Sequence, residues 1–192
     1  MKKANLAEIV KAYCDHLSEQ QRHKMLRLLN KYEELFDGTL GDFKTDPIKL
    51  NLRKDTKPYH GRPYPIPHSQ LRVFKKEVER LVELGVLKRQ PESEWGSPTL
   101  IIAKKNGTVR FLSDFREVNK RIIRTPFPIP KISSVLQEME GFTYATALDL
   151  NMGYYTIRLD PDSQKICTII LPWGKYSYMR LPMGISGSPD FF

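Results

Sequence analysis

Residues 146–160 read TALDLNMGYYTIRLD, and their first half continues an alternating pattern that begins at Thr143. Up to Leu150, bulky side chains alternate with small ones and finally with Asp149. This period of two predicts a β-strand. Two alanines on the same face as Asp149 leave room for a ligand beside its carboxylate. An acid at a strand end is also a common turn former, so the pattern alone leaves both interpretations open.

Upstream of this strand, two short apolar runs flank Asn106-Gly107. This dipeptide favours a type I′ hairpin turn, because both central residues of that turn need a positive φ. A two-residue loop would pair Lys105 with Thr108 and Ala103 with Arg110. Lys105 and Arg110 would then project from one side of the hairpin. The sequence therefore predicts two cations directed at a common ligand.

Apolar residues at helical spacing predict further elements. Ser18 and Gln21 form a capping box at the start of one amphipathic helix. The prolines of residues 46–67 predict an extended connector without a helix. A second hairpin is expected around Pro172-Trp173-Gly174. Its arms would be residues 164–171 and 176–181, and the expected helices are residues 6–13, 18–37, 69–84 and 132–139.

Charge is distributed unevenly along the chain, whose formal net charge is +9. Residues 46–131 hold 19 basic and 9 acidic side chains, whereas residues 132–192 hold 4 and 6. A basic middle followed by a mildly acidic end suggests a surface that binds a polyanion next to a site that uses carboxylates. A solvated basic face without a ligand is the alternative.

Composition excludes several classes of protein. The chain is 40% hydrophobic, which is typical of a globular fold rather than of disorder. Its apolar runs are too short for a signal peptide or a membrane span, which predicts a soluble, non-secreted protein. Cys14 and Cys167 lack the spacing of a zinc site or a disulfide framework.

Four segments carry a resemblance to a known family: PESEWGSPTLIIAKK, GTVRFLSDFREVNKR, TALDLNMGYYTIRLD and GKYSYMRLPMGISGSPDFF. In this order they resemble the reverse transcriptases of gypsy-type LTR retrotransposons and of retroviruses. The resemblance implies an α+β fold of the right-hand polymerase type. It places a helical N-terminal extension at residues 1–45, a basic fingers region at residues 46–128 and a partial palm with an interleaved fingers hairpin at residues 129–192.

The resemblance also assigns roles to single residues. Nucleotidyl transfer uses two divalent cations, here Mg²⁺, held by carboxylates. Asp149 matches the first of three metal-binding aspartates, and the carbonyl of Leu150 matches a metal ligand. Lys105 and Arg110 match the cations that hold the triphosphate. The hairpin is shorter than in retroviral relatives, so Lys104 stays open as a substitute for Lys105.

Three further residues match nucleotide-binding positions. Tyr154 matches the aromatic residue beneath the sugar of the incoming nucleotide, although packing in the core beside Tyr155 is an alternative. Met183 stands where many relatives have Gln or Phe, which leaves its contact to nucleotide open. Gly184 lets the backbone approach the bound strand closely. Asp114 and Arg116 are interpreted as a structural ion pair that supports the template side.

No Asp-Asp pair occurs in the sequence, whereas the family places its second and third metal-binding aspartates in a downstream Tyr-x-Asp-Asp hairpin. A helix start at Ser188 is also cut short after Phe192. We therefore expect a fragment that continues into the rest of the palm, a thumb and ribonuclease H, and that is not catalytically competent alone.

The implied function is that of an RNA-directed DNA polymerase, which adds deoxynucleotides to a primer on an RNA or DNA template. The expected location is the cytoplasm, inside a virus-like particle with access to the nucleus, and no membrane is involved. The alternatives are a non-catalytic nucleic-acid-binding remnant of a decayed retroelement and, ranked lower, an RNA-dependent RNA polymerase.

Overall fold

The computed structural model describes residues 3–103 and 109–192. The chain forms two compact units, Met1–Gly41 and Asp42–Phe192. The division of the second unit into fingers (46–128) and palm (129–192) stays a prediction. No helix among the described residues is long and apolar enough to cross a membrane.

The first unit is helical, as expected for an N-terminal extension. It contains α1 (Leu6–Tyr13), α2 (Glu19–Lys31) and the 3₁₀ helix η1 (Glu33–Phe36). The capping box is confirmed, because Ser18 accepts from the Gln21 amide and the Gln21 side chain accepts from the Ser18 amide. One continuous helix over residues 18–37 was a wrong prediction. At Tyr32 the backbone leaves the α-helical region (φ −117°, ψ 33°), and its N–H turns back to the carbonyl of Leu29.

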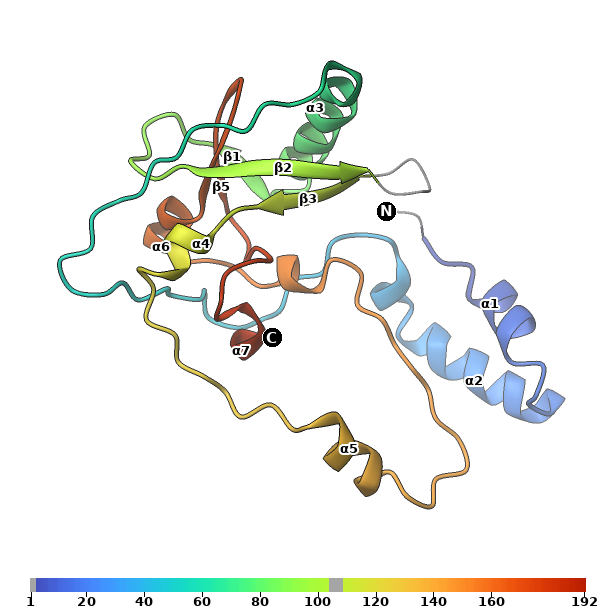
Figure 1. Cartoon of the computed structure of the whole chain (residues 1–192). Coiled ribbons are helices and arrows are strands. Elements are labelled where there is room, and N and C mark those ends of the chain that lie inside the picture. Colours follow the sequence, from blue (N-terminus) through green and yellow to red (C-terminus); the bar gives the residue numbers. More distant parts are fainter. Residues whose placement is uncertain (1–2, 104–108) are drawn as a thin grey trace. The chain divides into compact units, whose positions relative to one another are not determined.

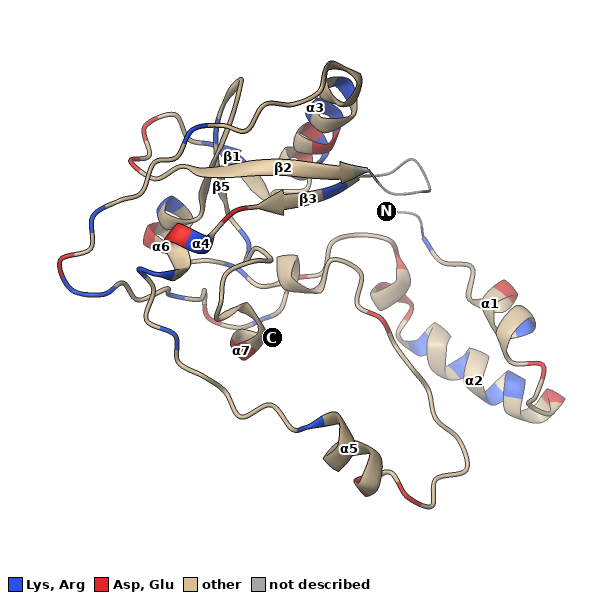
Figure 2. Ribbon diagram, viewed as in Figure 1, with Lys and Arg blue, Asp and Glu red and all other residues tan. Residues whose placement is uncertain are grey.

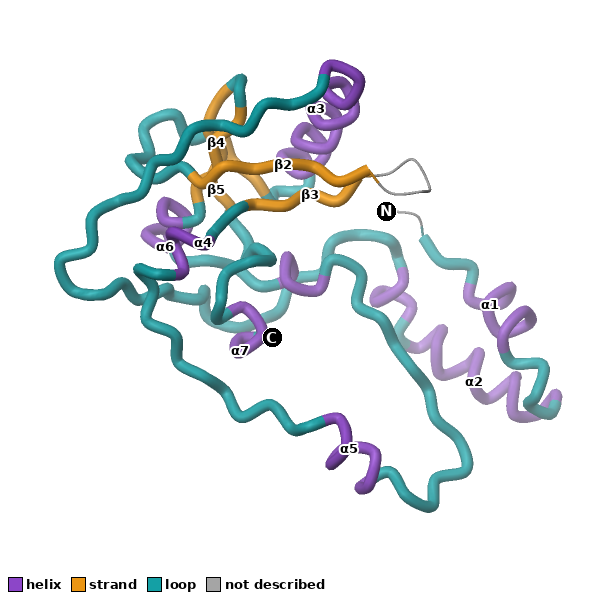
Figure 3. Tube along the Cα trace, in the orientation of Figure 1, coloured by secondary structure: helices purple, strands orange, loops and turns teal. Residues whose placement is uncertain are grey.

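The second unit is built on one five-stranded sheet with the order β1-β5-β4-β2-β3 (Figures 1 and 3). All neighbouring strands run antiparallel except β2 and β4, which are parallel. The fingers hairpin expected near Trp173 therefore joins the same sheet as the hairpin upstream. The strands are β1 (Leu87–Arg89), β2 (Ser97–Ala103), β3 (Val109–Ser113), β4 (Thr168–Leu171) and β5 (Gly174–Tyr178).

Helix α3 (His68–Glu83) buries its apolar stripe against this sheet. The ring of Phe74 is fully buried and lies 5.3 Å, between ring centroids, from both Phe111 of β3 and Trp173 of the β4–β5 turn. Gly85 ends the helix with φ +67°, as the sequence predicts. Burying a side chain of the size of Phe74 contributes about 1.5–3 kcal/mol. The contact between α3 and the sheet is therefore a main part of the core.

The connector of residues 46–67 contains no helix, as its prolines predict. It is attached to the rest of the second unit by isolated bridges, which pair Ile48 with Leu159, Leu52 with Ile122 and His60 with Gly96. Leu50 is buried, and its amide donates to the Ser163 hydroxyl at 2.8 Å.

The first arm of the second hairpin begins later than expected, because residues 164–166 belong to α6 (Pro161–Ile166). Asp160 caps this helix by accepting from the Ser163 amide at 3.0 Å, and Pro161 lies in its first turn. An acid followed by proline is a helix-start signal. This signal was present in the sequence and was overlooked.

The remaining elements are short: α4 (Arg116–Asn119), α5 (Ile132–Glu138), the 3₁₀ helix η2 (Gly153–Thr156) and α7 (Ser188–Phe191). Gly187 rather than Ser188 is the N-cap of α7, and the Ser188 hydroxyl donates to the Pro182 carbonyl. Every residue from 123 to 151 is exposed, and this stretch, which includes α5, is called the exposed segment below (Figure 3).

Candidate functional site

Asp149 lies in the exposed segment and not at the end of a strand. Residues 144–150 have no regular secondary structure, so the strand predicted from Thr143 to Leu150 was wrong. Its alternation is real, but a strand exists only where a second strand accepts and donates its backbone hydrogen bonds. None of the described strands or bridges pairs with these residues. Leu150, the predicted carbonyl ligand, is 58% exposed.

The surroundings of Asp149 do not fit a two-metal site. Among residues 3–103 and 109–192, no group of three or more His, Cys, Asp and Glu side chains lies close enough to hold a metal ion. Two cations bound side by side need several carboxylates, and one exposed aspartate cannot supply them.

Arg110 lies in β3, which confirms the antiparallel pair but changes its register. Ile102 pairs with Arg110 and Ala103 pairs with Val109, so the predicted pairing of Ala103 with Arg110 was wrong by one residue. A register shift of one residue moves a side chain to the other face. Arg110 therefore shares a face with Ile102, which is 49% exposed. Lys104, Lys105 and Asn106-Gly107 lie outside the described residues.

Two roles were considered for Tyr154, a contact beneath the nucleotide sugar and packing in the core, and the structure places the neighbouring Tyr155 in the core. Tyr155 is the core residue, since it is buried and its ring centroid lies 6.0 Å from that of Tyr178. Burial raises its pKa. Tyr154 is half-buried in η2, and its ring lies 5.2 Å from that of Phe192 in a tilted arrangement.

An open, mostly apolar hollow of about 550 Å³ adjoins Tyr154. It is lined by side chains from the start of the exposed segment and from α7 and its end: Phe127, Ile129, Pro130, Pro189, Asp190, Phe191 and Phe192. Tyr154 therefore borders an open space.

Met183 and Gly184 form an exposed loop beside the end of β3. Gly184 has φ +97°, and a Cβ there would lie 3.4 Å from the Ser113 carbonyl oxygen. Asn119 holds the loop from α4: its amide group donates to the Gly184 carbonyl at 2.8 Å and accepts from the Ser186 amide at 2.9 Å. The sequence analysis missed Asn119, although it stands inside the quoted GTVRFLSDFREVNKR segment.

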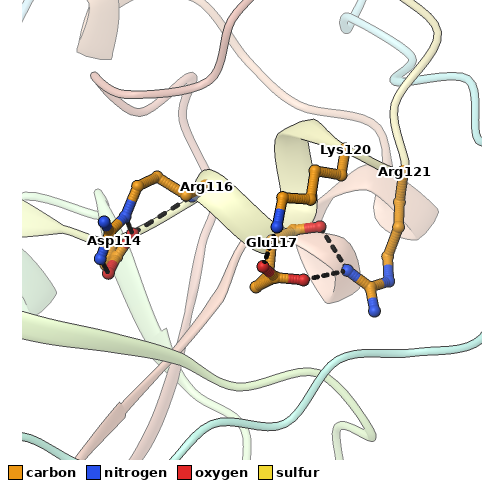
Figure 4. A network of polar contacts seen from close by, with 5 residues as sticks. All are labelled: Asp114, Arg116, Glu117, Lys120 and Arg121. Carbon is orange, nitrogen blue, oxygen red and sulfur yellow. Dashed lines mark hydrogen bonds and ion pairs between the residues drawn. The ribbon is translucent and has the colours of Figure 1, made fainter.

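The ion pair predicted between Asp114 and Arg116 is confirmed, with Nη2 2.6 Å from Oδ2 (Figure 4). Tyr64 of the connector also donates to Asp114 at 2.8 Å. Hydrogen bonds from Arg116 and Tyr64 hold the pKa of Asp114 well below its usual range, while Asp114 raises the pKa of Tyr64. Next to it, Glu117 pairs with Lys120 and Arg121 (Figure 4).

A row of exposed cations follows the connector (Figure 2). Arg121 fixes this path by donating to the Lys57 carbonyl at 3.1 Å, with its guanidinium 5.5 Å from the centre of the Tyr59 ring. The residues of the row, called the connector cations below, are Arg53, Lys54, Lys57 and Arg62, all exposed. Such an array can neutralise the phosphates of a nucleic acid.

Comparisons with known proteins show which family the chain is similar to. Residues 102–192 match the family described as "Reverse transcriptase (RNA-dependent DNA polymerase)". The retrovirus-related Pol polyprotein from transposon 412 of Drosophila melanogaster is 29% identical and covers 91% of this chain. That from transposon opus of the same fly is 30% identical over 86% of the chain. The chain spans only 16% and 17% of these two relatives.

Solved structures give the same result for the fold. The native crystal structure of prototype foamy virus protease-reverse transcriptase superposes with a TM-score of 0.84 at 27% identity, covering 100% of this chain and 26% of the viral one. The α+β class and the helical N-terminal region predicted from the sequence are thus confirmed. By its match over these residues and its likeness to the viral enzyme, the part of the chain from residue 102 to residue 192 belongs to the reverse transcriptase family.

Proposed function

We propose that this chain is part of an RNA-directed DNA polymerase of a gypsy-type LTR retrotransposon. The main support is that the family match on residues 102–192 lies within a chain whose full length follows a protease-reverse transcriptase at 27% identity. Because the chain spans about a sixth of its curated relatives, the activity belongs to a larger polyprotein. Primer, template and deoxynucleotide are its proposed ligands.

Template binding is supported by charge and by the neighbours in fold. Foamy viral protease-reverse transcriptase has been solved in complex with an RNA/DNA hybrid, and it shares this fold with a TM-score of 0.79 at 22% identity. The connector cations are exposed along the connector, which leads to α3. We infer that they bind the sugar-phosphate backbone, without reading the base sequence.

The nucleotide would be held from several sides. Arg110, with Lys105 or Lys104, would neutralise the triphosphate. Tyr154, which borders an open hollow, would limit the space beside the sugar, and the loop of Met183 and Gly184 would approach the nucleotide through its backbone. Gly184 is suited to this role because it has no Cβ and adopts a positive φ.

Asp149 is the proposed first metal-binding carboxylate. Mg²⁺, when bound, would polarise the transferred phosphate and the attacking hydroxyl. The described residues do not fit two such ions, and we propose that carboxylates from outside this chain complete the site.

A primer-extension assay tests the proposal. The chain would be assayed on primed homopolymer RNA, alone and after joining to a compatible downstream palm, thumb and metal-binding hairpin. We expect no sustained synthesis by the chain alone and template-dependent synthesis by the joined protein, which Asp149→Asn abolishes. Joined protein that folds and binds primer–template but never extends it would instead support a non-catalytic nucleic-acid-binding remnant.

Binding can be tested without catalysis. The affinity of the chain for primer–template should fall with salt, since each neutralised phosphate contributes about −0.9 to the log–log slope on duplex DNA. Replacing Lys54, Lys57 and Arg62 by Gln should make the slope clearly shallower. The matched control, Lys24→Gln with Arg27→Gln in α2, should leave it unchanged. Equal salt slopes for both variants would show that the connector cations do not contact the nucleic acid.

A further inference from the structure

The exposed segment begins at a clamp formed by one carboxylate. Asp190 of α7 accepts from Arg124 twice, with Nε at 2.7 Å and Nη2 at 3.0 Å, and it accepts from the Phe127 amide at 3.1 Å. Its side chain is only 1% exposed, whereas that of Arg124 is 49% exposed. A desolvated carboxylate with three donors, two of them from a guanidinium, forms strong and directional contacts.

The other end of the exposed segment returns to the same short helix. Directly after it, Gly153 approaches the ring of Phe192 so closely that a Cβ on Gly153 would lie 3.0 Å from two ring atoms. Tyr154 packs on the same ring, and Phe43, which precedes the connector, contacts it with the ring centroids 6.3 Å apart. Both ends of the segment that carries Asp149 are therefore held by α7 and the residue after it.

Helix α7 can act as a fixed point because it is attached to the core. Ser188 is buried, and its hydroxyl donates to the Pro182 carbonyl at 2.8 Å. Its amide donates to Ile185, which is 2% exposed, at 3.0 Å. A displacement of α7 would disturb these buried groups. The clamp therefore links the exposed segment to the packed core.

We propose that Asp190 is a positioning residue: by clasping Arg124 and the Phe127 amide, it fixes one end of the segment that carries Asp149. This inference rests on the proposed function only where it treats Asp149 as catalytic. The proposed role of Asp190 needs no contact with a reacting group. It sets where the chain enters the exposed segment and thereby restricts the positions that Asp149 can occupy.

The test measures distances in the whole chain by pulsed electron resonance between two spin labels. One label replaces Leu148, which is 73% exposed and precedes Asp149. The other replaces Arg89, an exposed residue of β1. Cys14 is changed to Ser, and Cys167 is buried and stays. The variants are Asp190→Asn, which keeps an acceptor for Phe127 but removes the charge, Arg124→Gln and the conservative Arg124→Lys.

We expect Asp190→Asn and Arg124→Gln each to broaden the distance distribution about twofold, because a charge-assisted bidentate contact is replaced by a weaker neutral one. Arg124→Lys keeps the charge but cannot form the bidentate contact. The width of its distance distribution should lie between those of the two other variants and that of the parent. The matched control Glu77→Gln breaks the Arg80–Glu77 pair of α3, at 2.8 Å, and should leave the width unchanged.

Unchanged widths in Arg124→Gln would overturn the proposal, and this exposed variant serves even where Asp190→Asn fails to fold. Equal broadening in Glu77→Gln would also overturn it, since a general loosening would then explain the result. The measurement needs no DNA synthesis. An extension assay without DNA synthesis would therefore not contradict the role proposed for Asp190. Unchanged distance distributions would not contradict the proposed polymerase function.

Discussion

Strands β2 and β3 of the sheet and residues 143–150 of the exposed segment were both predicted as strands from the sequence, but they reach different structures. In the sheet, five consecutive residues of β2 pair with β3, and Phe111 and Thr99 are buried. In the exposed segment, residues 143–150 alternate between bulky and small side chains, yet they form no strand and Leu148 is 73% exposed. The difference teaches that alternation describes a strand's two faces and does not supply its partner.

The first prediction removes the same side chain from each region. Leu81→Ala in α3 truncates a residue that is 1% exposed, and Leu148→Ala truncates one that is 73% exposed. The core variant should lose about 2–5 kcal/mol of unfolding free energy, because lost burial and a cavity add together. The variant in the exposed segment should change by less than about 0.5 kcal/mol. Urea unfolding of both measures the difference, and similar losses would mean that the exposed segment packs as part of the core.

Where the sequence prediction succeeded, the partner residues lie close together in the sequence. The capping box of Ser18 and Gln21, the stop of α3 at Gly85 and the Asp114–Arg116 pair depend on neighbours a few residues away. Local spacing is enough for such features. They were all predicted and are confirmed.

Where it failed, the structure depends on distant groups or on small offsets. The register of β2 and β3 differs by one residue from that of a two-residue turn, an offset that periodicity cannot resolve. Asp190 meets Arg124 across 66 positions of the chain, and Asn119 reaches Gly184 across 65. No local pattern encodes these contacts, so the clamp and the loop support were not predicted.

The second prediction removes one charge from each region. Asp114→Asn should lose about 1–3 kcal/mol, because Asp114 is largely buried and accepts from Arg116 and Tyr64. Asp149→Asn in the exposed segment should stay within about 0.5 kcal/mol. Chemical denaturation of the two variants and the parent, at neutral pH, gives the comparison. If Asp149→Asn proved as costly as Asp114→Asn, Asp149 would be part of a polar network.

The pH dependence of stability sharpens this second comparison. Because the pKa of Asp114 is lowered in the folded state, its contribution is present above the unfolded value of about 3.9 and is lost as pH falls below it. The difference between the parent and Asp114→Asn should therefore be constant above about pH 5 and shrink toward lower pH. Subtracting the two curves removes the other carboxylates, which both proteins share. A difference that grows on acidification would contradict the assigned direction.

The smallest expected contrast concerns two glycines in the left-handed region. Gly184 (φ +97°) and Gly141 (φ +85°) would both strain an alanine, but their surroundings differ. A Cβ at Gly184 would meet the Ser113 carbonyl at 3.4 Å and Phe115 at 3.5 Å, whereas nothing lies within 4 Å of one at Gly141. In the packed region the strain cannot relax, and Gly184→Ala should lose about 1–2 kcal/mol. Gly141 follows α5 in the exposed segment, where local opening relieves the strain without unfolding the sheet. Gly141→Ala should therefore change the free energy of global unfolding by less than about 0.5 kcal/mol.

Tryptophan fluorescence during denaturant unfolding measures the two variants, because Trp95, which is buried, and Trp173 report on the sheet. An equal loss in both variants would show that α5 unfolds together with the sheet, and the distinction between the two regions would then be one of exposure and not of stability.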